Sequence, residues 1–305
     1  MSGAAGVEDV YSAIEEAARL LDVACSRDKV WPVLTAYEDA LAGAVVVFSM
    51  ATGERSTGEL DYTVTVPLEH GDPYARALSN GFVAETDHPV GALLSDVQGR
   101  CPIRGYAIDC GVVGGFKKTY AFFPLDNLQT LSTLADIPSM PRALVESAGP
   151  FARRGLDDKV TMMGIDYQHR TMNVYFGRFP AECLEPATVL SMLREIGLPE
   201  PDEQMLEFIR KSFSIYTTLS WDSLKVERIC FAVITQDPMA LPARIKPEIA
   251  KFAKSAPHAY AGERILVYGS TLSPNGEYYK LGSYYQMAPE TWKLLQTSGA
   301  IQDRA

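Results

Sequence analysis

Apolar and polar residues alternate along many short segments of this 305-residue chain. In Leu-Asp-Tyr-Thr-Val-Thr-Val at 60–66, the apolar side chains share one face of an extended strand and the polar ones share the other. Thr-Met-Asn-Val-Tyr-Phe at 171–176 repeats this pattern. Such strands are typical of an antiparallel sheet that packs one face against an apolar layer and turns the other toward a polar space.

The first forty residues have helical spacing instead. Apolar residues from Val7 to Leu21 recur at intervals of three and four, which predicts one helix. A second helix can begin at Ser26 and run to Tyr37, with Pro32 in its first turns, where proline is tolerated.

From Val45 onward, pairs of expected strands alternate with expected helices. The strand pairs are 45–50 with 59–67, 103–110 with 116–123, 159–167 with 170–177, 212–221 with 225–235, and 263–272 with 277–287. Helices are expected near 72–81, 89–98, 141–153, 186–196, 202–211, 245–253 and from Pro289. The polar pair Gln168-His169 is a hairpin signal. The arrangement is a structural repeat of five hairpins.

Five hairpins supply about ten antiparallel strands, and closing such a sheet removes its edges. We therefore predict an α+β fold: a closed antiparallel barrel of about ten strands ringed by helices, formed by residues 1–305 as one domain. If the helices cover the apolar faces, the polar faces line the interior. About ten strands leave a lumen wider than side chains alone fill, so the barrel should hold a ligand.

The bulk composition narrows the class of ligand. A formal charge of -10 and a pI near 5.0 argue against a nucleic-acid binder. The five cysteines are scattered without a CxxC pair, which suits a reducing compartment. The N-terminus shows no signal-peptide pattern, and the apolar run 44–48 is too short to span a bilayer. We expect a cytoplasmic protein without membrane partners, and nothing demands more than a monomer.

Three basic residues, Lys118, Arg228 and Lys280, lie on the expected polar faces of separate strands. Gathering cations in a partly enclosed space is costly unless an anion is normally present. A diphosphate is the obvious candidate, because Arg and Lys both bind phosphate oxygens. The polar-face residues that could add hydrogen bonds to it are Thr171, Asn173 and Tyr216.

Asp61 is the natural partner for a metal ion in this interior. An inward carboxylate near a diphosphate could hold Mg²⁺ through one protein oxygen, with phosphate oxygens and waters as the other ligands. Asp109 could assist from the outer shell. The alternative is that both carboxylates form salt bridges with the same lysines, and spacing alone favours that alternative.

Several familiar motifs are absent. The sequence has no GxxxxGK[ST] loop for nucleotide hydrolysis and no DDxxD run of the kind used by terpene cyclases. The four histidines, including His169, are isolated along the chain, which indicates ordinary surface or core residues rather than metal ligands or bases.

The residues on these strands resemble the soluble aromatic prenyltransferases with the ABBA fold, also called the PT barrel. The resemblance runs from Val7 to about Met287. It is carried by Gly-Gly-Phe-Lys-Lys-Thr-Tyr-Ala-Phe-Phe-Pro at 114–124, Val-Val-Val-Phe-Ser-Met at 45–50, Glu-Leu-Asp-Tyr at 59–62, Ile-Pro-Ser-Met-Pro at 137–141 and Glu-Tyr-Tyr-Lys-Leu-Gly at 277–282.

The resemblance implies a barrel that binds a prenyl diphosphate and an aromatic acceptor together. It assigns the diphosphate to Lys118, Thr171, Asn173, Tyr216, Arg228, Tyr279 and Lys280, with Val47, Ser49 and Thr63 nearby. It places Asp61 on the Mg²⁺ ligand of metal-dependent members. The acceptor wall it implies comprises Tyr120, Met162, Tyr175, Phe213, Ser214, Val267 and Tyr284. Thr161 and Thr291 depart from the glutamines of a similar sequence, and both departures fall on the acceptor side.

The expected function is transfer of a geranyl group from geranyl diphosphate to a carbon of an electron-rich aromatic, such as a dihydroxynaphthalene or a phenolic polyketide. The cations and Mg²⁺ would stabilise the departing diphosphate, and the ring faces of Tyr120, Tyr175 and Tyr216 would stabilise the allylic cation. Ser214 or a water could take the ring proton. Two alternatives stay open: prenylation of oxygen or nitrogen, or of a phenazine or indole, with a dimethylallyl donor among the possibilities; and a non-catalytic barrel that only binds such molecules.

Overall fold

Ten antiparallel strands form a closed barrel in the computed structural model, which describes residues 5–53 and 58–288. Neighbouring strands follow the order β1-β10-β9-β8-β7-β6-β5-β4-β3-β2, so every strand pairs with its sequence neighbours and β10 closes on β1. The strands are β1 Val46–Ala51, β2 Asp61–Pro67, β3 Gly105–Gly111, β4 Gly115–Phe122, β5 Val160–Asp166, β6 Thr171–Gly177, β7 Ser214–Ser220, β8 Arg228–Thr235, β9 Leu266–Ser273 and β10 Gly276–Gln286. The predicted α+β barrel is confirmed.

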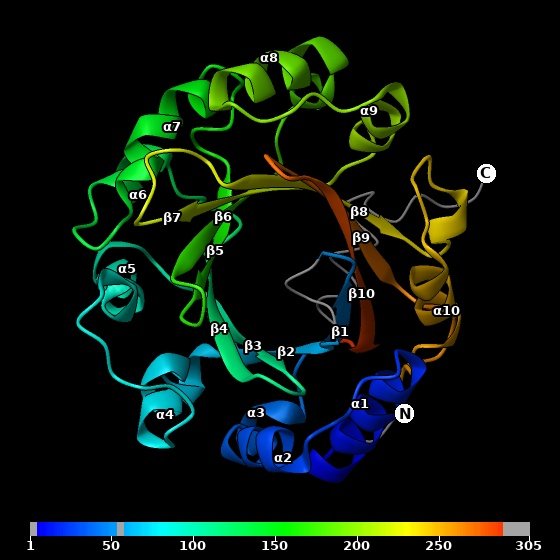
Figure 1. The fold of residues 1–305 in the computed structure, drawn as a ribbon. Coiled ribbons are helices and arrows are strands. Elements are labelled where there is room, and N and C mark those ends of the chain that lie inside the picture. The colour runs from blue at the N-terminus through cyan, green and yellow to red at the C-terminus, as the bar shows by residue number, and fades with distance from the viewer. Residues whose placement is uncertain (1–4, 54–57, 289–305) are drawn as a thin grey trace.

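Helices surround the barrel as an outer ring (Figure 1). The α-helices are α1 Val7–Leu20, α2 Arg27–Ala36, α3 Glu38–Leu41, α4 Pro73–Ser79, α5 Leu93–Arg100, α6 Leu131–Ala135, α7 Arg142–Ala152, α8 Pro186–Ile196, α9 Glu203–Ile209 and α10 Pro247–Ser255. Short 3-10 turns are η2 Leu68–His70, η3 Pro89–Gly91, η4 Ala181–Leu184 and η5 Pro238–Ala240.

The main hydrophobic core fills the layer between the outer barrel face and these helices. The apolar residues of β2, Tyr62, Val64 and Val66, are fully or almost fully buried there. Between them, Thr63 and Thr65 are only half-buried and line the interior. Burial of one strand face against the helices therefore fixes which side chains enter the lumen.

Most differences from the predicted elements lie at their ends. The strands expected from 59, 103, 212, 225 and 263 begin two or three residues later. Two short helices, α3 and α6, were not predicted. At five residues, α6 is too short to show a helical repeat, and it rests on the Thr130 cap, whose hydroxyl accepts from the Thr133 amide. The helix expected from Pro289 lies outside the described residues.

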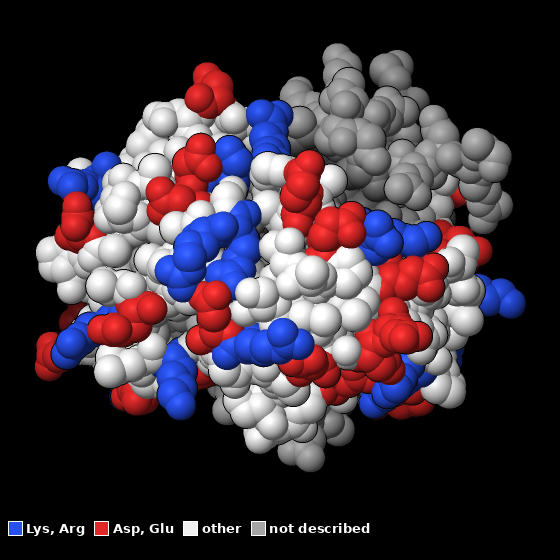
Figure 2. All heavy atoms as spheres, turned by 90° about the horizontal axis from the view of Figure 1, so that it is seen from above, with Lys and Arg blue, Asp and Glu red and all other residues white. Residues whose placement is uncertain are grey.

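The molecular surface carries no continuous basic stripe on the face shown in Figure 2, where Lys and Arg are interspersed with Asp and Glu. Within residues 5–53 and 58–288, no helix combines the length and apolar character needed to cross a bilayer.

Candidate active site

A cavity of about 600 Å³ occupies the barrel interior. This is within the range of small-molecule sites, which are mostly apolar with a few convergent polar groups. All ten strands contribute to its lining. The lining residues that the sequence predicts for the site are Val47, Ser49, Thr63, Tyr120, Met162, Tyr175, Tyr216, Val267, Lys280 and Tyr284.

Three tyrosines form one wall of this cavity. The ring centroids of Tyr120 and Tyr175 are 6.1 Å apart and edge-on, and those of Tyr175 and Tyr216 are 4.6 Å apart. Gly164 gives them room, because a Cβ there would come within 2.9 Å of the Tyr120 ring. Burial raises the pKa of all three phenols, so they stay neutral and present electron-rich ring faces to the cavity.

Lys118 lies two residues before Tyr120 on β4, so the two side chains share one face of the strand. We call the end of the barrel around Lys118 its polar end. Its ammonium lies 3.3 Å from Asp166 and 3.9 Å from Asp109. Burial by itself lowers the pKa of Lys118, but the carboxylates of Asp166 and Asp109 outweigh it and raise the pKa above its ordinary value. Lys118 is therefore a permanent cation.

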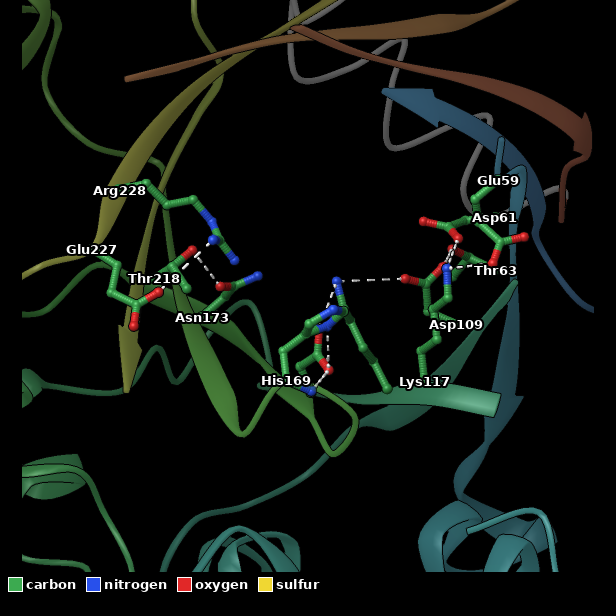
Figure 3. Close-up of polar contacts among 12 residues, drawn as sticks. Glu59, Asp61, Thr63, Asp109, Lys117, His169, Asn173, Thr218, Glu227 and Arg228 are labelled. Carbon is green, nitrogen blue, oxygen red and sulfur yellow. Dashed lines mark hydrogen bonds and ion pairs between the residues drawn. The ribbon is translucent and has the colours of Figure 1, made fainter. Parts of the chain in front are cut away.

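Arg228 reaches the same end from the opposite side of the barrel (Figure 3). Its guanidinium is 3.8 Å from Glu227, a loose pair that leaves most of its donors for another acceptor. Beside it, Thr218 donates to the Asn173 amide oxygen at 2.7 Å, and the Asn173 amide donates to the Tyr175 hydroxyl at 3.2 Å. The network joins the polar end to the tyrosine wall.

Lys280 lies on the cavity wall itself. No carboxylate among the described residues lies within ion-pair distance of its ammonium. A cation in that position is suited to an anionic ligand that enters the lumen.

Acidic residues complete the polar end. Asp61 accepts a hydrogen bond from Lys117 at 2.5 Å, and Lys117 also lies 3.2 Å from Glu59. Asp109 is fully buried: Thr63 donates to its Oδ1 at 2.9 Å, while its Oδ2 has no hydrogen-bond partner among the described residues. Burial and then the charge of Asp61 raise the pKa of Asp109. The sequence left open that Asp61 and Asp109 form salt bridges with the lysines of the lumen. Asp109 does so with Lys118, whereas Asp61 pairs with Lys117 instead.

A metal ion at this end would have to take most of its ligands from the substrate. The described residues contain no group of three or more His, Cys, Asp and Glu side chains suited to a metal ion. Asp61 keeps a second carboxylate oxygen beyond the Lys117 contact, and its side chain is 20% exposed. One carboxylate with diphosphate oxygens and waters is a usual Mg²⁺ environment, so the residues fit that ion.

Comparison with known proteins decides the family. A model of the aromatic prenyltransferase Orf2 family matches residues 5–296. The chain belongs to this family. Three relatives match nearly all of it. A flaviolin linalyltransferase of Streptomyces virginiae is 50% identical over 94% of both chains, and a 5,10-dihydrophenazine-1-carboxylate 9-dimethylallyltransferase of Streptomyces anulatus is 48% identical over 97% of this chain and 98% of its own. A furaquinocin biosynthesis prenyltransferase of Streptomyces sp. (strain KO-3988) is 50% identical over 93% of this chain and 91% of its own.

The chain is therefore an aromatic prenyltransferase, and the alternative of a non-catalytic carrier is wrong. The polar end of this prenyltransferase also contains Thr171, which pairs with Asp166 on β5 and Ser220 on β7. Lys118, Thr171, Asn173 and Arg228 all lie at that end, on the strand faces that carry the cavity lining.

Tyr279 was expected to bind the diphosphate, but its side chain does not face the lumen. Because side chains alternate along β10, Tyr279 points away from the lumen that Lys280 faces. Its ring stacks on Tyr268 in the outer core, and its hydroxyl donates to Glu277 at 2.6 Å. The structure gives its phenol no route to a diphosphate in the lumen.

Three expected acceptor residues do not line the cavity. Thr161 sits at a bulge in the pairing of β5 with β6, and its hydroxyl donates to the Tyr175 carbonyl at 3.2 Å. Phe213 precedes β7 and is 38% exposed, while the Ser214 hydroxyl donates to the Phe176 carbonyl at 3.1 Å. Thr291 lies outside the described residues. The acceptor roles of all four stay predictions.

Sequence reasoning missed Lys117, Glu59, Asp166 and His169. Lys117 alternates with Lys118, which predicts opposite faces. A β-bulge overrides this: Asp109 pairs with Lys118 and Cys110 with Phe116, so Lys117 is the extra residue and its side chain is redirected toward Asp61. The polar hairpin at 167–170 was the available signal for His169.

Proposed function

We propose that this prenyltransferase transfers a geranyl group from geranyl diphosphate to a ring carbon of an electron-rich aromatic, such as a dihydroxynaphthalene or a phenolic polyketide. One observation carries the proposal: a cavity of about 600 Å³ is lined by Lys280 and by three neutral tyrosines, and Lys118 and Arg228 lie on the lumen-facing sides of strands that line it. The cationic end suits a diphosphate, and the aromatic wall suits the allylic group and the acceptor.

The reaction begins when the bond between the allylic carbon and the diphosphate oxygen breaks. Negative charge then grows on the diphosphate, where Lys118, Arg228 and Lys280 are fixed cations that stabilise it. When bound on Asp61, Mg²⁺ would add further positive charge at the leaving group. The residues that would hold it are Asp61 with outer-shell support from Asp109.

The allylic cation lies against Tyr120, Tyr175 and Tyr216, whose ring faces attract positive charge. Attack by an acceptor carbon forms the new bond, and the closed barrel limits access of water that would quench the cation. The ring proton then leaves to a bound water, because Ser214 does not line the cavity and its hydroxyl already donates to the Phe176 carbonyl.

The relatives define a second candidate. One is named for a linalyl group and flaviolin, and another for a dimethylallyl group and a dihydrophenazine carboxylate. Since both are about equally similar to this chain, a dimethylallyl donor with a phenazine acceptor is the competing assignment.

Incubation of purified protein with either geranyl or dimethylallyl diphosphate, each with a dihydroxynaphthalene, a resorcinol and a phenazine carboxylate, separates these candidates. Mass spectrometry identifies the donor used, and NMR distinguishes carbon from oxygen or nitrogen attachment. We expect geranylated dihydroxynaphthalene with a new carbon–carbon bond. Products formed only with dimethylallyl diphosphate would contradict the donor assignment, and ethers or N-prenyl products alone would contradict the attachment.

A further inference from the structure

His169 connects the barrel surface to the polar end of the lumen. It lies in the turn between β5 and β6, three residues after Asp166. Its backbone amide donates to Asp166 Oδ1 at 2.8 Å, and its ring Nδ1 lies 3.2 Å from Oδ1 and 3.1 Å from Oδ2 (Figure 3). Both oxygens of one carboxylate are thus in contact with one residue.

Asp166 links His169 to Lys118 inside the barrel. Its side chain is only 6% exposed, whereas that of His169 is 40% exposed. Asp166 Oδ2 is also the oxygen 3.3 Å from the Lys118 ammonium. Although burial raises the pKa of Asp166, the hydrogen bonds from His169 and the charge of Lys118 lower it overall to about 2. Asp166 is therefore ionised whenever the enzyme works.

An ionised Asp166 competes with the donor diphosphate for Lys118. Each hydrogen bond that the carboxylate accepts from elsewhere withdraws part of its charge and fixes its position. Lys118 can then turn toward a diphosphate without leaving an unpartnered buried anion behind, which would be costly.

We propose that His169 is a positioning residue for donor binding, which acts through Asp166 on Lys118; this rests on the proposed function, in which Lys118 binds the diphosphate. The Nδ1 contact is the part that a side-chain change can remove, because the backbone amide remains. Asparagine can place an amide nitrogen near the position of Nδ1, while glutamine reaches toward that of Nε2.

The experiment compares His169→Ala, His169→Asn and His169→Gln, with His258→Ala as control, because His258 lies in another loop, where its ring contacts the Gly262 carbonyl and the Tyr260 ring. Binding of inorganic diphosphate by calorimetry and steady-state KM and kcat for geranyl diphosphate are the readouts. We expect the Ala and Gln variants to bind diphosphate about three- to tenfold more weakly, the loss expected for one hydrogen bond. The Asn variant should recover to within about twofold, with kcat and the acceptor KM unchanged in all three.

A double-mutant cycle tests the route through Asp166. In an Asp166→Asn background, His169→Ala should change diphosphate affinity no further, because the carboxylate it acts on is gone. An equal effect in both backgrounds, an unchanged affinity in the Ala and Gln variants, or a defect that asparagine does not restore would each overturn the proposal. Because the diphosphate readout needs no prenyl transfer, failure of the proposed function would show separately, as a natural enzyme that binds diphosphate but gives no geranylated product.

Discussion

The ammonium of Lys117 lies 2.5 Å from Asp61 Oδ1 at the polar end of the barrel. Burial lowers the pKa of Lys117, but the charge of Asp61 and then that of Glu59 raise it overall, so the lysine stays charged. The contact holds the Asp61 carboxylate in place before any substrate binds. It also means that an incoming cation has to share this carboxylate with a lysine.

Asp61→Asn should remove most activity and the stimulation by Mg²⁺ while leaving the fold intact. The amide keeps the size of the carboxylate but loses the charge that would bind a metal ion near the diphosphate. Turnover measured over a range of Mg²⁺ concentrations checks this, with circular dichroism for the fold. Glu146→Gln on the exposed face of α7 is the matched control and should behave as the natural enzyme does. Full activity of the natural enzyme in excess EDTA would count decisively against a metal role.

Replacing Lys118, Arg228 or Lys280 with Ala should each weaken diphosphate binding or lower turnover by about tenfold to a thousandfold, the loss expected for one preorganised charge. The acceptor profile should hardly change, because these cations lie on the polar side of the tyrosine wall. Lys251→Ala, an exposed lysine of α10, is the control. An Arg228→Ala enzyme with altered acceptor choice and normal donor affinity would show that the two half-sites are placed wrongly.

The barrel could be predicted because its evidence is local and repeated. Alternation along β2 and β6 shows which side chains face the helices, and five hairpins leave few topologies other than closure. The same alternation places Lys118, Tyr120 and Lys280 on the lumen-facing sides of their strands, because each is paired in register with the neighbouring strand. Periodicity is thus a reliable guide wherever the pairing register is unbroken.

Other parts of the site could not be predicted, because they depend on breaks in the pairing register and on contacts between distant segments. The bulge that redirects Lys117 comes from pairing with β3, which the local sequence does not reveal. Tyr279 shows a different failure: its role came from resemblance alone, although alternation with Lys280 already predicted the opposite face. The contact of His169 with Asp166 needed the turn geometry at 167–170, where Arg170 has a φ of 50°.

Asp166 should also make the free energy of unfolding depend on pH in the acidic range. Its pKa falls from an ordinary 3.8 to about 2 in the folded chain, so its contribution is fully present above pH 4 and is lost as pH falls toward 2. The shift corresponds to about 2 kcal/mol at neutral pH. Urea unfolding of the natural enzyme and Asp166→Asn at pH 7 and at about pH 3 checks this. The gap in unfolding free energy between the two proteins should narrow at the lower pH, and a gap that stays constant would refute the assignment.

Selectivity for the acceptor should depend on the part of the lumen around Tyr284, which lies four residues after Lys280 on β10. Tyr284 lines the cavity together with Val267, and burial raises its pKa to about 12, so it presents a neutral phenol. Tyr284→Ala should change the ratio of products from one unsymmetrical phenol by about 1 to 3 kcal/mol of differential barrier, the scale of a lost pocket contact. Tyr284→Phe separates the ring from the hydroxyl: an unchanged ratio would assign the effect to shape.

Thr161→Gln on β5 tests the position at which this chain has threonine and a similar sequence has glutamine. The Thr161 hydroxyl bonds to the Tyr175 carbonyl, and its methyl group occupies the space that a Cβ on Gly177 would need. A glutamine cannot fit there without turning toward the lumen or displacing β6, so we expect it to alter the product ratio while the KM for geranyl diphosphate moves by less than about twofold. Product ratios and donor KM from the same phenol assay decide the matter. If turnover and ratios in both Thr161→Gln and Tyr284→Ala match the natural enzyme, the acceptor does not bind in the part of the lumen around Tyr284.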